Sequence, residues 1–398
     1  MSSKSTTEKE HCLATHFPPS ALPQPLHVGR PNIGDEARFL DRLHGVLERR
    51  WLTNAGPLEQ EFEERLAQYL GVRHCIAICN GTVALELAIR ALELTGEVIV
   101  PSLTFIATAH ALQWQQIRPV FCDIDRHRYC IDPSAVERHI TPQTSAILGV
   151  HLYGRPCDVE ALTAIAQRHN LKLLFDAAHA FGCSHQGQMI GNFGSCEVFS
   201  FHATKLFNSF EGGAVATNDD QLAHKIRLMK NFGFAGEDKV VYIGTNGKMT
   251  EVCAAMGITN LESLDHFIAV NQRNLDAYRA GLADLPGVSL IGYDENQRNN
   301  YQYVILEIDE ERFGLSRDRL QAILRDQNVL VRRYFYPGCH RMEPYRTLYP
   351  DTGKTLPETE EFCERVLALP TGTQVSESIV QEICGMIRTV YTEAQRSV

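Results

Sequence analysis

Short apolar runs alternate with helical patterns along the first 220 residues of the 398-residue chain, and this alternation constrains the fold most strongly. Several runs end in Gly, Pro or Asp, as buried strands do. The runs are CIAIC, EVIVP, PVFCDID, SAILGVHLYG, LKLLFDAA, EVFSFH and GGAVATN. The helical patterns between them include VALELAIRAL, FIATAHALQWQ and VEALTAIAQRHN. The sequence therefore predicts an α/β fold with a mostly parallel central sheet, helices on both faces, and ligands bound beyond the carboxyl ends of the strands.

The remaining segments divide the chain into three predicted parts. Residues 1–30 are rich in Ser, Thr, Pro and His without periodicity, which predicts a tail or a strap across another surface. Residues 31–260 form the large domain, opened by two helical patterns, EARFLDRLHGVLERRW and EQEFEERLAQYLG. Residues 261–398 form a smaller α+β domain. Its patterns are the helix NLESLDHFIAVNQRNLDAYRAGL, the strands VSLIGY and NYQYVILEID, and the helix RDRLQAILRDQN.

Charge and composition exclude several classes of protein. A formal net charge of -10 and a pI near 5.9 disfavour binding to nucleic acid or anionic lipid. No apolar run approaches the roughly 20 residues that span a bilayer, and the polar opening MSSKSTTEKE is unlike a secretory signal, so a cytoplasmic protein is predicted. The 12 cysteines lie in scattered apolar contexts, which indicates reduced, buried thiols and no metal site.

Two segments at predicted strand ends carry candidate ligand-binding groups. In NGTVALELAIRAL, Asn80, Gly81 and Thr82 form a turn whose backbone N–H groups open a helix, which is either an anion site or an ordinary cap. In FDAAHAFG, Asp176 follows the apolar run LKLLF. A buried carboxylate needs a partner that favours its charge, such as a protonated heterocyclic nitrogen, although a helix cap or a structural Arg would also serve.

A third segment, SFHATKLFNSFEGGAV, places Lys205 among apolar and hydroxyl-bearing residues after a strand. Desolvation lowers the pKa of such a lysine and frees its amine as a nucleophile. An anion cradle, a buried acid and a desolvated amine at one sheet edge match pyridoxal phosphate (PLP). Its phosphate needs backbone donors, its aldehyde a Lys amine, and its ring nitrogen an acid.

The order of motifs resembles the DegT/DnrJ/EryC1/StrS sugar aminotransferases, a family with the fold-type I aminotransferase architecture. The resemblance runs from about Asn32 to the end of the chain. The matching segments are WLTNAGPLEQEFEERLAQYLG, NGTVALELA, PSLTFIATAHAL, PVFCDID, HLYGRPCD, FDAAHAFG, SFHATKLFNSFEGGAV, GTNGKMTE and LPTG. It implies that Lys205 forms the Schiff base with PLP, that Asp176 contacts the pyridine nitrogen, and that His179 lies beside the ring oxygen. The further cofactor contacts that it implies are Gly81, Thr82, Phe105 and Ser200.

The resemblance also implies a homodimer in which two subunits complete each active site. GTNGKMTE resembles the stretch that reaches the neighbouring subunit's cofactor phosphate, with Asn246 as the first contact and Lys248 as the second. The family pattern has Arg where this chain has Lys248, and Lys offers a point charge rather than a fork. Substrate contacts are expected from Thr53, Asn54, Tyr336 and His340.

The activity that the resemblance implies is transfer of an amino group from L-glutamate to a nucleotide-linked keto-sugar, with PLP cycling through pyridoxamine 5'-phosphate. WLTNAGP, SFHATKLFN and GTNGKM are most similar to members that aminate C4 of dTDP-4-keto-6-deoxyglucose. Amination at C3 of a 3-keto isomer, a PLP dehydratase and an amino-cyclitol aminotransferase are the alternatives. A non-enzymatic regulator is disfavoured because no basic DNA-binding module is present, and dehydration at C3 because that branch replaces the Schiff-base lysine with His.

Overall fold

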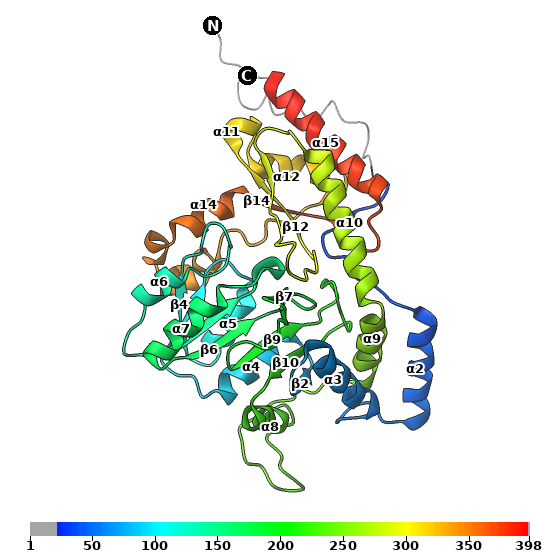
Figure 1. Ribbon diagram of the computed structural model, residues 1–398, viewed down its shortest axis with the longest axis vertical. Helices are drawn as coiled ribbons and strands as arrows, with labels where there is room; N and C mark the ends of the chain where they lie inside the picture. Colours follow the sequence, from blue (N-terminus) through cyan, green and yellow to red (C-terminus); the bar gives the residue numbers. More distant parts are fainter. Residues whose placement is uncertain (1–21, 397–398) are drawn as a thin grey trace.

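A seven-stranded sheet forms the centre of the protein, whose computed structural model describes residues 22–396 (Figure 1). Its strand order is β2-β10-β9-β6-β5-β3-β4. The strands are β2 (His74–Ile78), β3 (Glu97–Pro101), β4 (Arg118–Cys122), β5 (Thr144–Val150), β6 (Lys172–Asp176), β9 (Cys196–Ser200) and β10 (Gly213–Thr217). Within this sheet β10 runs antiparallel to both neighbours and the other pairs are parallel. Each predicted apolar run forms one of these strands, and the predicted α/β fold is confirmed.

Helices cover both faces of this sheet. One face packs against α4 (Gly81–Ala91), α5 (Ile106–Gln113) and α8 (Asp220–Met229). The other packs against α3 (Pro57–Leu70), α6 (Pro133–Arg138), α7 (Val159–His169) and α9 (Glu251–Glu262). Along β3, Val98 and Val100 belong to the first apolar cluster and Ile99 to the second. This alternation is that of a strand buried on both sides, which is why its sequence reads as an uninterrupted apolar run.

The C-terminal part is a smaller α+β unit, as predicted. An antiparallel sheet of β11 (Val288–Leu290), β12 (Val304–Ile308) and β14 (Val366–Leu369) shares an apolar cluster with α10 (Leu264–Leu282), α12 (Arg317–Asp326) and α15 (Glu377–Arg396). Shorter elements complete the fold: the hairpin β7 (Ser184–His185) and β8 (Gln188–Met189), and the helices α11 (Glu310–Phe313), α13 (Tyr345–Leu348) and α14 (Pro357–Arg365).

The N-terminal segment crosses the smaller unit before it reaches the large one. Leu22 and Leu26 are buried there, and β1 (Leu26–His27) pairs in parallel with β13 (Val329–Leu330). Residues 1–21 of the predicted tail lie outside the described residues. The chain then forms α2 (Glu36–Arg49), which packs beside α9 at the right-hand edge of Figure 1.

One helix differs from its prediction. The single helix expected over 260–282 is two helices, α9 and α10, separated at Ser263. The first of them begins earlier, at Glu251, because the Thr250 side chain caps it by accepting from Cys253 N–H. None of the helices in the described ranges is long and apolar enough to cross a membrane.

Candidate active site

A cavity of about 640 Å³ opens where the carboxyl ends of β5, β6 and β9 meet the first turns of α4 and α5. The structure brings most of the predicted cofactor residues to its wall. They are Gly81, Thr82, Phe105, Asp176, His179, Ser200 and Lys205. This position beyond the strand ends is where parallel sheets bind ligands.

The first turn of α4 offers backbone donors to an anion. Asn80 caps the helix, since its side chain accepts from Val83 N–H at 2.8 Å and its carbonyl from Ala84 N–H at 3.1 Å. The N–H groups of Gly81 and Thr82 precede these and have no acceptor within the helix. Gly81 also lies against Ser200, where an added Cβ would come within 2.9 Å of the serine Cβ. A glycine is therefore required for the turn and the end of β9 to approach this closely.

Asp176 is the last residue of β6 and its side chain is buried. The carboxylate accepts hydrogen bonds from Thr108 Oγ1 at 2.8 Å and from Ala178 N–H at 3.0 Å. Burial nevertheless raises its pKa, because these two hydrogen bonds and the nearby charge of Lys205 offset only part of the desolvation. A protonated ring nitrogen would supply the missing positive charge, so this acid fits the pyridine nitrogen of PLP. Thr108 itself was not predicted, because it lies in an apolar helical pattern that reads as core.

Lys205 lies in a turn after β9, where its backbone N–H donates to His202 O at 2.9 Å. Its half-buried side chain lines the cavity. Burial lowers the pKa of Lys205 to about 8, although the negative charge of Asp176 acts in the opposite direction. A larger fraction of this amine is neutral near pH 7 than in an exposed lysine, and the neutral form is the one that attacks an aldehyde.

His179 presents a neutral ring at the cavity wall. Burial first, and the charge of Lys205 second, lower its pKa well below the usual value. Its Nδ1 accepts from Tyr153 N–H at 3.3 Å, so the proton of the neutral ring is on Nε2. The ring lies parallel to Phe335 with centroids 5.6 Å apart and contacts Tyr303 at 4.7 Å. An N–H donor held in this way fits a phenolic ring oxygen.

Four predicted residues lie on loops away from this chain's own cavity. Thr53 and Asn54 belong to the connection between α2 and α3, where Asn54 is exposed. Asn246 pairs with Asn231, and Lys248 Nζ donates to Asn231 Oδ1 at 3.1 Å while lying 4.5 Å from the Phe232 ring centre. None of these four residues lines the cavity of its own chain.

The two remaining predicted substrate contacts are engaged elsewhere. Tyr336 lies beneath two guanidinium groups, those of Arg317 at 4.9 Å and Arg333 at 4.2 Å. His340 is buried, with Nδ1 2.6 Å from Ser102 Oγ and Nε2 2.5 Å from Glu360 Oε1. The structure does not bring either side chain to the cavity. Instead it brings residues that sequence reasoning missed: His202, Glu211, Tyr303, Arg332, Tyr334 and Phe335.

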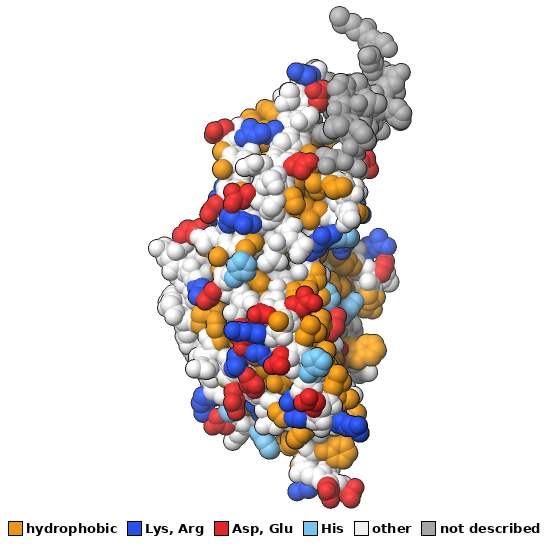
Figure 2. Space-filling view, turned by 90° about the vertical axis from the view of Figure 1, so that its right-hand side faces the viewer, with side chains coloured by type: hydrophobic (Ala, Val, Ile, Leu, Met, Phe, Trp, Pro, Cys, Tyr) orange, Lys and Arg blue, Asp and Glu red, His pale blue; other side chains and the backbone are white. Residues whose placement is uncertain are grey.

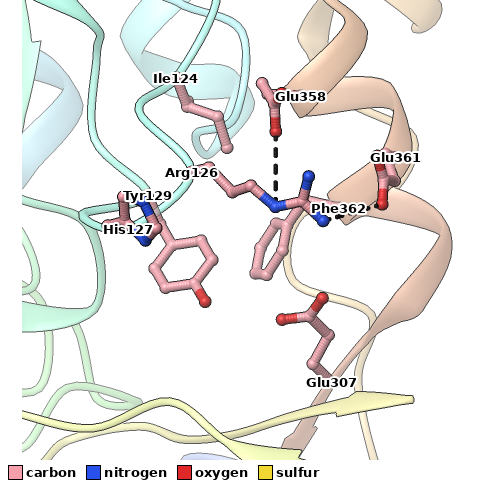
Figure 3. Close-up of a pocket in the computed structure, with 8 residues that line it drawn as sticks. All are labelled: Ile124, Arg126, His127, Tyr129, Glu307, Glu358, Glu361 and Phe362. Atoms are coloured by element: carbon pink, nitrogen blue, oxygen red, sulfur yellow. Dashed lines mark hydrogen bonds and ion pairs between the residues drawn. The ribbon is translucent and has the colours of Figure 1, made fainter. Parts of the chain in front are cut away.

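A second cavity, of about 150 Å³, lies between the loop after β4, β12 and α14 (Figure 3). It contains none of the predicted site residues. Arg126 crosses it with its guanidinium 3.9 Å from Glu358 and 3.3 Å from Glu361, as the dashed lines show. The third carboxylate of the lining, Glu307, pairs with Arg365 at 3.8 Å. All three carboxylates therefore have arginine partners, and this cavity belongs to the contact between the two parts of the chain.

Both the fold and the cavity are those of an aminotransferase that uses PLP. A model of the DegT/DnrJ/EryC1/StrS aminotransferase family matches residues 34–388, and the chain belongs to this family.

Several relatives match over nearly their whole length. The dTDP-4-amino-4,6-dideoxy-D-glucose transaminase of Shigella dysenteriae is 39% identical over 93% of this chain and 100% of its own. The Escherichia coli protein of the same name is 38% identical over 90% of this chain and 97% of its own. The crystal structure of DesI in the presence of its TDP-sugar product superposes with a TM-score of 0.90 at 49% identity, covering 95% of this chain and 96% of that one.

Proposed function

We propose that this protein transfers an amino group from L-glutamate to C4 of dTDP-4-keto-6-deoxyglucose, giving dTDP-4-amino-4,6-dideoxyglucose. The observation that carries this proposal is the cavity in which Lys205, Asp176 and the first turn of α4 face one another. The identity of the nucleotide sugar is supported by the names of the two curated relatives and by the TDP-sugar product in the DesI structure. Free thiols on all 11 cysteines of residues 22–396 support a reducing, cytoplasmic location.

Each residue of the cavity has a distinct task when PLP is bound. The cofactor supplies an electron sink for the carbon that loses its proton. Asp176 would keep the ring nitrogen protonated, His179 would donate from Nε2 to the ring oxygen, and Gly81 and Thr82 would hold the phosphate through their N–H groups with Ser200 beside them. Lys205 would hold the aldehyde through Nζ. Once the amino donor had displaced it, the Lys205 amine would take up and return the proton of the donor Cα.

We further propose that two copies of the chain complete each site. Large apolar side chains are exposed on two regions: the end of α2 with the following loop, and residues 232–243. They include Leu47, Trp51, Leu52, Phe232, Phe234, Val240 and Ile243. Figure 2, which views the side that carries α2, shows apolar side chains among charged ones across this face. A second copy of the chain bound to this surface would bury these side chains. Asn246 and Lys248 of each copy would then approach the cofactor phosphate of the other copy.

The test begins with the first half of the reaction. The purified protein is incubated with PLP, its visible absorption band is recorded, and excess L-glutamate is added. Conversion to the spectrum of pyridoxamine phosphate is expected, followed by recovery of the band when dTDP-4-keto-6-deoxyglucose is supplied. Recovery with the 3-keto isomer alone would move the proposed reaction to C3. Failure of both sugars after normal conversion by glutamate would refute the proposed substrate and leave transamination standing.

A further inference from the structure

Two consecutive arginines after β13 have different surroundings. Arg333 is ion-paired with Asp318 at 2.9 Å and lies over the Tyr336 ring. Arg332 instead lines the cavity, where its guanidinium lies 5.7 Å from the ring centre of Tyr334. No carboxylate in the described part of the chain pairs with Arg332. Arg332 is exposed to solvent, so its hydrated guanidinium remains available to pair with an anionic ligand that enters the cavity.

The backbone fixes the position of Arg332. Its N–H donates to Ala368 O at 3.2 Å, and its carbonyl accepts from Ala368 N–H at 2.7 Å. Ala368 belongs to β14, whose four residues are all buried, and the preceding Val331 is buried as well. The side chain therefore starts from a rigid point, which lowers the entropic cost of binding a ligand there.

The other charged groups of the cavity wall already have partners or tasks. His202 lies 3.4 Å from Glu211, and Asp176 and Lys205 are assigned to the ring nitrogen and the aldehyde of the cofactor. Within the described lining, Arg332 is thus the remaining cation. A planar guanidinium matches a carboxylate with two parallel hydrogen bonds.

We propose that Arg332 binds a carboxylate of the amino-acid donor, an inference that rests on the proposed transaminase function. Arg332 belongs to the wall that continues through Tyr334 and Phe335 to His179, at 4.9 and 5.6 Å between successive rings. Because His179 is assigned to the ring oxygen beside the aldehyde, this wall would border the reacting end of bound PLP. The donor carries one carboxylate on its reacting Cα, whereas a sugar that reacts at C4 carries its diphosphate on C1, across the hexose. The carboxylate is therefore the anion that comes to Arg332.

The experiment compares Arg332→Gln and Arg332→Met with the matched control Arg333→Gln. Stopped-flow spectra give the apparent Kd and the maximal rate for L-glutamate, and calorimetry gives the Kd of maleate, a dicarboxylate with no amine to transfer. Because the Arg332 variants lose a charge-assisted pair of hydrogen bonds, their Kd values for L-glutamate and for maleate are expected to rise about 10- to 100-fold. The visible band of the lysine-bound cofactor and the KM for the dTDP-sugar should be unchanged. Arg333→Gln should match the wild type in every measurement.

Wild-type affinity for glutamate and maleate in both Arg332 variants would overturn the proposal. A rise confined to the KM for the dTDP-sugar would also overturn it, and would assign Arg332 to the diphosphate. If Arg332→Gln does not fold, Arg332→Met, which keeps the apolar stem, gives the same comparison. Weakened maleate binding together with no sugar amination by the wild type would refute the proposed sugar while supporting the role of Arg332.

Discussion

Replacement of Lys205 by Met is expected to stabilise the cofactor-free protein at neutral pH. Burial lowers the pKa of Lys205 from 10.5 to about 8, and Asp176 offsets only part of this effect. A tenfold change in proton affinity corresponds to about 1.4 kcal/mol. The charged amine therefore destabilises the fold by about 3 kcal/mol below pH 8, relative to the unfolded chain. Met has a similar length and no charge, so the variant does not carry this destabilisation.

The pH dependence of this effect has a defined sign. Because the folded pKa lies below the unfolded one, the unfolded chain binds more protons between pH 8 and 10.5. The free energy of unfolding of the wild type should rise with pH over this window relative to that of Lys205→Met. Urea unfolding of both cofactor-free proteins at matched concentration measures the difference, with Lys172→Met at an exposed site as the control. Equal stability of wild type and Lys205→Met at pH 7, or a difference that is constant up to pH 10.5, would refute the reasoning.

Three further substitutions test the cofactor contacts. Asp176→Asn should lower kcat at least about 100-fold with PLP still bound, because an amide does not keep the ring nitrogen protonated, and near-normal turnover would contradict the assignment. Thr108→Val removes the 2.8 Å hydrogen bond to Asp176 and should lower kcat about tenfold, which steady-state kinetics would measure. Gly81→Ala places a Cβ 2.9 Å from that of Ser200 and should weaken PLP binding about tenfold or more in a fluorescence titration; unchanged affinity would exclude the close-approach argument.

The sequence predicts the strands well because each is an apolar run stopped by Gly, Pro or Asp. It does not predict their order in space, nor that β10 enters antiparallel between β2 and β9, because those features depend on contacts between distant segments. For a related reason the sequence pattern places the start of this helical region at Asn260, whereas α9 begins at Glu251. Residues on all sides of it are buried, so it lacks the polar face whose spacing identifies a surface helix.

The residues of the candidate site likewise fall into those that the sequence predicts and those that depend on contacts between distant segments. Asp176 and Lys205 follow strands in recognisable motifs, so their meeting at one sheet edge could be predicted. Tyr303 and Arg332 come from the smaller C-terminal unit, and they reach the cavity only because the two parts of the chain pack together. The family resemblance of its loop implies a substrate contact for His340, but the buried hydrogen bond of His340 to Glu360 depends on α14, and no sequence pattern connects that helix to the loop.

Cofactor binding and fold stability are coupled through two buried groups. Burial raises the pKa of Asp176 and lowers that of Lys205, so each charge is disfavoured in the protein alone. An aldehyde consumes the amine, and a basic ring nitrogen gives the carboxylate a positive partner. One ligand thus removes both penalties at once. PLP should therefore raise the free energy of unfolding of the wild type by more than the sum of the increases that it gives in Lys205→Met and in Asp176→Asn. In each variant one of the two buried charges is already absent, so PLP can relieve only the other.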